Sequence, residues 1–130
     1  MEPRSLLPDN GPIALIDTTT EGSHEDLRVV ATQDHSLIQK WAITRRAEPA
    51  TGEATESGPR TITVNDEGTG IRFNFPGIGR FRPIAWDEWF RNFDAYSLAF
   101  VYERDRPHQS PSHRYRMLPI ETLRRIADVR

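Results

Sequence analysis

Apolar side chains in the first half of the chain recur at the spacing of one helical turn. The positions concerned are Leu37, Ile38, Trp41 and Ala42. This spacing places them on one face of a helix, which we predict over Gln33–Arg46. Thr32 precedes this segment and has the short polar side chain typical of an N-cap. Pro49 follows the segment and is expected to stop the helix.

The second half of the chain contains two further helical patterns. The first consists of Trp86, Trp89, Phe90 and Phe93, at positions i, i+3, i+4 and i+7. It predicts a helix over Trp86–Ala95, with Asp87 and Glu88 in its first turn, where the helix dipole favours negative charge. The second pattern consists of Ile120, Leu123, Ile126 and Ala127. It predicts a C-terminal helix that begins at Pro119.

Period-two alternation of apolar and polar residues predicts the central strands. Thr61–Val64 and Ile71–Phe75 alternate on either side of a glycine-containing turn and predict an antiparallel hairpin. Leu98–Tyr102 predicts a third strand and His113–Leu118 a fourth.

Two short β-prone runs lie nearer the N-terminus. Ile13–Asp17 and Leu27–Ala31 flank a polar, turn-like stretch and are consistent with a second hairpin. Residues 1–12 are rich in proline and are expected to form a flexible arm. Residues 47–60 have no large apolar side chain and are expected to form a solvated, mobile loop.

These elements predict one α+β domain over residues 13–130. We expect an antiparallel sheet of three to four strands, two helices packed on one face of it, and a C-terminal helix. The expected core is Leu37, Ile38, Trp41, Ile62, Val64, Ile71, Phe73, Phe75, Trp86, Phe90, Phe93, Leu98 and Phe100.

Composition narrows the class of protein. A chain of 130 residues suits one domain and is far shorter than the roughly 250 residues of a TIM barrel. The chain has no cysteine, which excludes disulfides and thiolate metal sites. No stretch approaches the roughly 20 apolar residues of a membrane span, so we expect a cytoplasmic protein without membrane contact.

Charge is unevenly distributed along the chain. Lys40 is the only lysine, and the other 16 basic residues are arginines. Residues 1–30 carry six acidic and two basic side chains, whereas residues 104–130 carry seven arginines and three acidic side chains. The acidic front and the basic tail therefore either neutralise each other or face different partners.

Several blocks of sequence resemble a family of small uncharacterised bacterial proteins. Members of that family carry T-x-D-H-x-x-I-x-x-W-A, then a short strand that ends in phenylalanine, and then I-S-W-D-E-F-F-x-x-F, L-A-F-x-Y and S-R-F-N-K. The similar blocks here are Thr32–His35 with Ile38, Trp41 and Ala42, then Ile71–Gly77, Ile84–Phe93, Leu98–Tyr102 and Ser112–Arg116. The resemblance covers roughly residues 31–118 and bears on the fold more than on the activity.

This chain departs from the family pattern at several places. Ala85 stands where the family has a capping serine, and Arg46-Ala47 stands near the family's glycine pair. Residues 1–30 and the last helix are additions. Many family members carry the name 1,4-alpha-glucan branching enzyme, which does not suit this chain, because such an enzyme needs a full barrel with carboxylates at its strand ends.

The histidines are weak candidates for catalysis or metal binding. Asp34 and His35 are adjacent, and on a helix they point about 100° apart, which disfavours a base with its orienting carboxylate. His108, His113 and Asp105 lie in a proline-rich, arginine-rich loop without regular ligand spacing. We therefore expect no catalytic residue, no metal and no cofactor.

Arginines and two aromatic residues are the candidates for contact with a partner. Phe81 lies between two arginines after a glycine turn, and Trp89 is the tryptophan we expect to be most exposed. The candidate nucleic-acid or anion contacts are Arg80, Arg82, Arg104, Arg106, Arg114 and Arg116.

The best hypothesis from the sequence is a non-enzymatic binding or adaptor module that contacts another macromolecule, with a protein favoured because the net charge is −2. The first alternative is nucleic-acid binding, which predicts that Arg80, Arg82, Arg114 and Arg116 converge on one face. The second is a small enzyme, which predicts a pocket that brings His35 or His113 near a carboxylate. The identity of the partner and the oligomeric state stay open.

Overall fold

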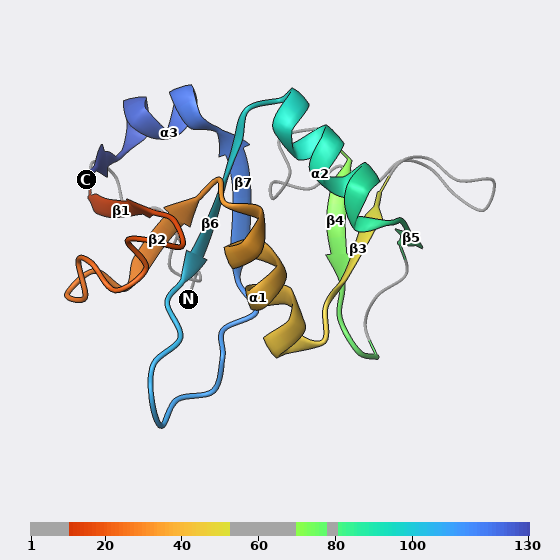
Figure 1. Ribbon diagram of the computed structural model, residues 1–130, viewed down its shortest axis with the longest axis horizontal. Helices are drawn as coiled ribbons and strands as arrows, with labels where there is room; N and C mark the ends of the chain where they lie inside the picture. Colours follow the sequence, from red (N-terminus) through yellow and green to blue (C-terminus); the bar gives the residue numbers. More distant parts are fainter. Residues whose placement is uncertain (1–10, 53–69, 78–80) are drawn as a thin grey trace, which may run out of the picture.

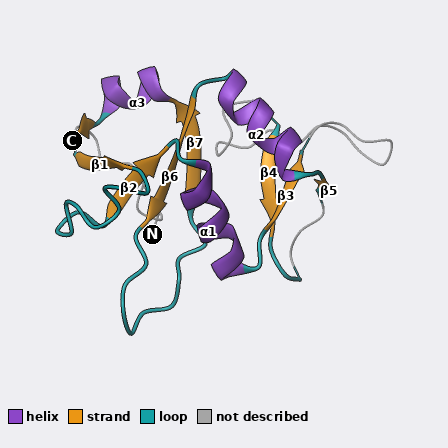
Figure 2. Cartoon of the chain, in the orientation of Figure 1, coloured by secondary structure: helices purple, strands orange, loops and turns teal. Residues whose placement is uncertain are grey.

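The computed structural model describes residues 11–52, 70–77 and 81–130 and confirms an α+β fold (Figure 1). The helices are α1 (His35–Arg45), α2 (Trp86–Ala95) and α3 (Ile120–Ile126). The strands are β1 (Pro12–Ile16), β2 (Val29–Thr32), β3 (Glu48–Thr51), β4 (Ile71–Asn74), β5 (Arg82–Pro83), β6 (Leu98–Glu103), β7 (Tyr115–Pro119) and β8 (Asp128–Val129). Figure 2 shows that the strands form two groups, with α1 and α2 beside them and α3 near the C-terminus.

The larger sheet has five strands in the order β7-β6-β2-β1-β8. The pairs β6–β7 and β2–β6 are antiparallel, whereas β1 pairs in parallel with both β2 and β8. The predicted N-terminal hairpin is therefore wrong. Residues 17–28 lead from the end of β1 back to the edge of the sheet at which β1 begins, so that β2 runs parallel to β1. A parallel pair requires such a connection of about a dozen residues.

The smaller sheet is antiparallel, in the order β4-β3-β5. Its central strand β3 lies inside the segment that we predicted to be a solvated loop, and Ala50 and Thr51 are buried. The part of the prediction that covers residues 48–51 is therefore wrong. These residues are buried because β3 pairs with β4 on one side and β5 on the other. Their side chains are small, so the hydrophobicity of the local sequence does not indicate this burial. Residues 53–69, including the predicted strand over residues 61–64, lie outside the described residues.

Helix α1 begins and ends differently from the prediction. Asp34, rather than Thr32, is the N-cap, and its carboxylate accepts a hydrogen bond from Ser36 N at 2.9 Å. Thr32 is instead the last residue of β2, where its hydroxyl donates to Ile16 O at 2.8 Å. At the other end, Arg46 adopts the left-handed conformation with φ 55°, and its N–H donates to the carbonyls of the last turn. Pro49 lies in β3 and does not end the helix.

The predicted core is largely confirmed. Among the predicted core residues, those buried in one cluster are Leu37, Ile38, Trp41, Ile71, Phe73, Phe90, Phe93, Leu98 and Phe100. Phe75 and Trp86 are half-buried at its edge, and Ile62 and Val64 lie outside the described residues. A second apolar cluster, which includes Ile13, Ala31, Val101, Leu118 and Leu123, was not predicted. It exists because alternate residues of the large sheet point to opposite faces, and α3 covers the second face.

In the parts of the chain that the structure describes, none of the helices has the length and apolar character that crossing a bilayer requires.

Candidate binding pocket

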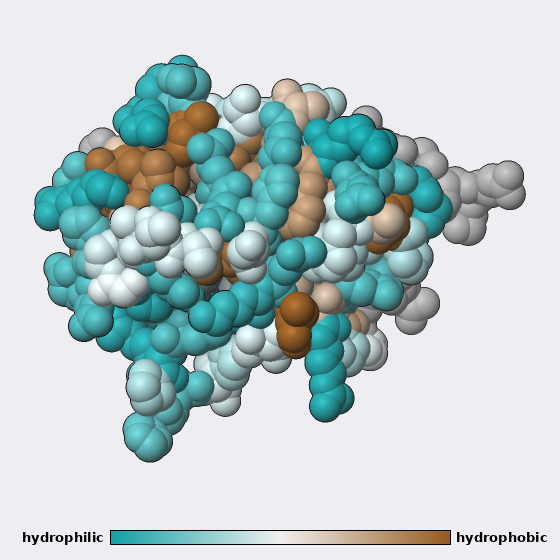
Figure 3. Space-filling view, viewed as in Figure 1, coloured by the Kyte–Doolittle hydropathy of each residue, from teal (hydrophilic) through white to brown (hydrophobic). Residues whose placement is uncertain are grey.

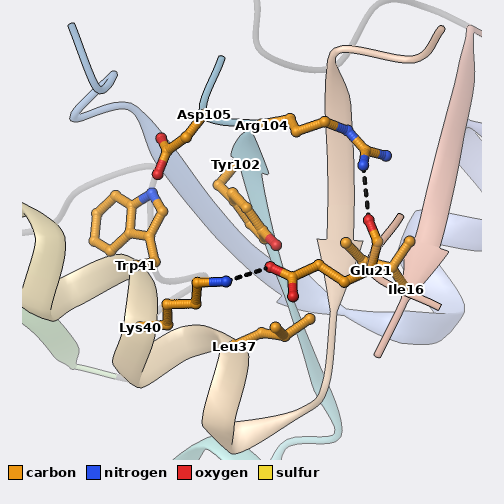
Figure 4. Close-up of a pocket in the computed structure, with 8 residues that line it drawn as sticks. All are labelled: Ile16, Glu21, Leu37, Lys40, Trp41, Tyr102, Arg104 and Asp105. Carbon is orange, nitrogen blue, oxygen red and sulfur yellow. Dashed lines mark hydrogen bonds and ion pairs between the residues drawn. The ribbon is translucent and has the colours of Figure 1, made fainter. Parts of the chain in front are cut away.

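A pocket of about 280 Å³ lies where α1, the 17–28 connection and the end of β6 meet (Figure 4). Its wall consists of Ile16, Glu21, Leu37, Lys40, Trp41, Tyr102, Arg104 and Asp105. The wall combines apolar surface from the core with two carboxylates and two cations. These residues come from three separate stretches of sequence, 16–21, 37–41 and 102–105, which the fold brings together.

An ion pair crosses the pocket from helix to loop. Lys40 Nζ of α1 lies 2.9 Å from Glu21 Oε2 of the 17–28 connection, and both side chains are partly exposed. A pair this exposed contributes little to stability, because water screens it and ordering two long side chains costs entropy. Both groups can therefore exchange this partner for a ligand at small cost.

Arg104 holds the 17–28 connection, which forms one side of the pocket. Its guanidinium donates to the backbone carbonyls of Glu21 at 2.8 Å, Ser23 at 2.9 Å, His24 at 3.2 Å and Leu27 at 3.3 Å. The planar guanidinium has five N–H donors in a fixed fork, which suits it to hold several carbonyls at once. Arg104 therefore fixes the loop that carries Glu21.

A buried arginine supports the opposite wall. The side chain of Arg45 has no exposed surface, and its Nη2 lies 2.5 Å from Asp105 Oδ1. The same guanidinium lies over the Trp41 ring at 4.5 Å and donates to the carbonyls of Trp41 and Ser112. Arg45 thereby holds Asp105 and Trp41 in fixed positions beside the pocket.

One buried hydrogen-bond donor in the wall has no acceptor within the described parts of the chain. Trp41 is 3% exposed, and its buried indole Nε1 has no acceptor there. Tyr102 is 8% exposed, and burial, together with the negative charge of Glu21, raises the pKa of its hydroxyl to about 12. The hydroxyl is therefore protonated at neutral pH. A buried donor without an acceptor costs roughly 1–3 kcal/mol, which a bound group with an acceptor would recover.

The histidines that we considered for catalysis lie outside this pocket. His35 Nε2 is 2.9 Å from Asp94 Oδ1, and its ring stacks on Phe90, but none of the eight wall residues is a histidine. Asp34 does not pair with His35. It accepts hydrogen bonds from the backbone N–H and hydroxyl of Thr18, which lower the pKa of Asp34 below its ordinary value.

The histidines of the loop between β6 and β7 are also absent from the wall of this pocket. His113 packs its ring edge-on against Phe75 at 5.1 Å, and Asp105 is held by Arg45. Within the described residues, no three His, Asp or Glu side chains are grouped closely enough to hold a metal ion.

The predicted arginine contacts are distributed over the two sheets. Arg82 is exposed in β5 of the small sheet, whereas Arg114 and Arg116 lie next to and within β7 of the large sheet. Arg106 donates to Glu25 O at 3.4 Å, and Arg114 lies 3.6 Å from the buried carboxylate of Glu103. Arg80 lies outside the described residues, so the convergence of the four arginines on one face stays a prediction.

The predicted aromatic contacts have different environments. Trp89 is completely buried and its Nε1 donates to Arg72 O at 3.0 Å, so the expectation that it is exposed is wrong. The helical stripe that contains Trp89 packs onto β3, β4 and β6, which places this ring inside the core. Phe81 is half-buried, and the Arg72 guanidinium lies 4.7 Å above its ring.

Local sequence patterns do not indicate this pocket. Lys40 is the only lysine and directly precedes Trp41, but nothing local connects these two residues with Glu21 or Asp105, which are 19 and 65 positions away from Lys40. Tyr102 fits the pattern of the predicted strand Leu98–Tyr102, so nothing in the sequence marks it as a pocket residue.

Comparison with known proteins adds no relative, because no family model, no curated protein and no solved structure matches this chain.

Proposed function

We propose that this chain is a non-enzymatic binding module whose partner is a protein, and that the pocket receives one polar side chain of that partner. The observation that carries the proposal is the pocket itself. Its wall contains a buried indole N–H that has no acceptor among the described residues, together with an exposed and exchangeable ion pair. Such a site offers a few fixed polar groups on an apolar wall, which is the usual composition of a specific binding site.

The outer surface also favours polar recognition. On the face shown in Figure 3, hydrophobic residues form separate areas among hydrophilic ones. The large apolar side chains that are exposed in the described residues are Ile43, Tyr96 and Ile126, each on a different part of the chain. Scattered apolar residues of this kind are normal on a surface and do not make a broad docking face.

Nucleic acid is the weaker alternative. Phosphate binding draws on cations that face solvent, whereas Arg104 and Arg106 are turned onto backbone carbonyls and Arg114 faces Glu103. In the pocket, the carboxylates of Glu21 and Asp105 balance the charges of Lys40 and Arg104, so its wall offers a phosphate no net attraction. An enzyme is weaker still, since the His35–Asp94 pair lies on the surface away from the pocket.

The test is a quantitative pull-down from extracts of the cells that produce the protein. Three baits are compared: wild type, Lys40→Met, which removes the rim cation and keeps its aliphatic stem, and Arg124→Ala, an exposed change on α3. We expect a protein that is enriched on wild type and on Arg124→Ala and is reduced at least tenfold on Lys40→Met.

Equal capture on all three baits would place the interface elsewhere and contradict the proposal. A parallel anisotropy titration with labelled single-stranded and double-stranded DNA and RNA covers the alternative. Micromolar binding that weakens steeply with salt would favour nucleic acid instead.

A further inference from the structure

We infer that the group this pocket accepts is a neutral carboxamide, the chemistry of an asparagine or glutamine side chain. The inference rests on the proposed function, because it takes the carboxamide to belong to a side chain of a partner protein. Free glutamine carries the same group. It is carried by the balance of charge in the wall and by two hydrogen-bonding atoms that have no partner among the described residues.

The charges of the wall disfavour an ion. Lys40 and Arg104 supply two positive charges, and Glu21 and Asp105 supply two negative charges. Because these charges balance, a carboxylate or an ammonium gains no net attraction from the wall that would offset the cost of removing the ion from water. A neutral group avoids that cost.

The open hydrogen-bonding groups call for a ligand with a donor and an acceptor. Trp41 Nε1–H is a donor only, so it needs an oxygen acceptor. Glu21 uses Oε2 for Lys40, and its Oε1 has no hydrogen bond among the described residues, so it can accept an N–H. A carboxamide has one carbonyl oxygen and two N–H donors on a single planar group, and so serves both sides of the pocket.

The dimensions and apolar surface fit a short side chain. The volume of about 280 Å³ lies just below the roughly 300–1,000 Å³ typical of sites for drug-sized molecules. Ile16 and Leu37 add aliphatic surface to the wall, which suits the methylene groups that carry a carboxamide.

The tryptophan indole resonances of the full chain provide the test. A ¹⁵N-labelled sample is titrated with N-acetyl-L-glutamine methylamide, which represents a residue within a protein, and separately with free L-glutamine. The matched probes are the corresponding methylamides of N-acetyl-glutamate and N-acetyl-lysine. Trp41→Phe assigns the Trp41 signal, and Trp89 is the internal control, since its Nε1 already donates to Arg72 O.

We expect the glutamine methylamide to shift the Trp41 indole signal saturably, at about millimolar concentration for so small a probe, and to leave the Trp89 signal unchanged. The glutamate and lysine probes should bind at least tenfold more weakly. Saturable binding of free glutamine tenfold tighter than its methylamide would keep the carboxamide but assign it to a small molecule.

The inference is overturned if the glutamate or lysine probe shifts the Trp41 signal as strongly, or if none of the probes moves it. The pull-down keeps this result separate from the proposed function. Partner capture that depends on Lys40, without any response to glutamine, rejects only the carboxamide. A glutamine response without a captured protein rejects only the protein partner.

Discussion

At the scale of single residues, two neighbouring arginines at the end of α1 have opposite environments. Arg45 is buried and ties the helix to the segment after β6 through Asp105 and Ser112. Arg46 is exposed and takes the left-handed conformation, which costs an ordinary L-residue roughly 1–2 kcal/mol. The side-chain contacts of Arg45 therefore stabilise the fold, whereas Arg46 occupies a backbone position that suits glycine.

Replacing Arg46 by glycine should stabilise the fold. Glycine reaches φ 55° without a steric penalty, so Arg46→Gly is expected to raise the free energy of unfolding by about 1 kcal/mol, measured by urea denaturation. Thr44→Gly is the matched control, because Thr44 is exposed inside the same helix, and glycine there should destabilise. A loss of stability in Arg46→Gly would show that its side chain matters more than its backbone conformation.

Replacing Arg45 by methionine should destabilise the fold. Methionine fills the apolar path of the side chain but leaves the carbonyls of Trp41 and Ser112 without their donor. We expect a loss of roughly 1–3 kcal/mol in the free energy of unfolding. Arg124→Met, on the exposed side of α3, should change it by less than about 0.5 kcal/mol. Equal values for the two variants would contradict the structural role of Arg45.

At the scale of elements, local pattern predicted the helices well and strand pairing poorly. Helix α2 was predicted with its bounds, because four large aromatic residues repeat at helical spacing. Strand β3 was missed, because its Pro-Ala-Thr residues are small and become buried only through β4 and β5. The parallel pairing of β1 with β2 was missed for a related reason, since residues 17–28 are held in place by Arg104, which directly follows the distant strand β6.

The N-terminus of α1 should make stability depend on pH. Hydrogen bonds from Thr18 lower the pKa of Asp34 in the folded chain below its ordinary value of 3.8. The unfolded chain therefore takes up this proton first as the pH falls. The stabilisation from Asp34 is fully present above about pH 4 and is lost as the pH falls through the lower folded pKa.

Urea denaturation of wild type and Asp34→Asn at a series of pH values tests this dependence. Asparagine keeps an acceptor at the N-cap but has no charge. We expect wild type to be more stable than the variant at pH 6 and the difference to shrink below pH 4. A difference that stays constant from pH 6 to pH 2 would rule out the role of the Asp34 charge.

At the scale of the whole molecule, the pocket depends on contacts between distant parts of the chain. The 17–28 connection, α1 and the end of β6 meet through Arg104, the Lys40–Glu21 pair and the Arg45–Asp105 pair. The sequence could not show this site, because each wall residue taken alone suits a helix surface, a strand or a loop. Only the fold brings into one pocket wall an exposed ion pair and an indole N–H that has no acceptor in the described part of the chain.

Loss of Arg104 should loosen the loop side of the pocket without unfolding the sheet. In Arg104→Leu, four carbonyls of the 17–28 connection lose their donor. We expect hydrogen exchange measured by mass spectrometry to become faster in peptides that cover residues 17–28. Peptides that cover β4 should exchange as in wild type. Unchanged exchange in residues 17–28 would mean that the connection is held by other contacts.

The most direct test of the central claim follows the indole N–H of Trp41 while the protein captured in the pull-down, once purified, is added to the ¹⁵N-labelled chain. The account predicts that the Trp41 signal shifts or broadens as the partner is added, that the Trp89 indole, bonded to Arg72 O, stays in place, and that Lys40→Met weakens the response. Binding that perturbs backbone signals elsewhere and leaves Trp41 unchanged would show that the pocket is not where the partner binds.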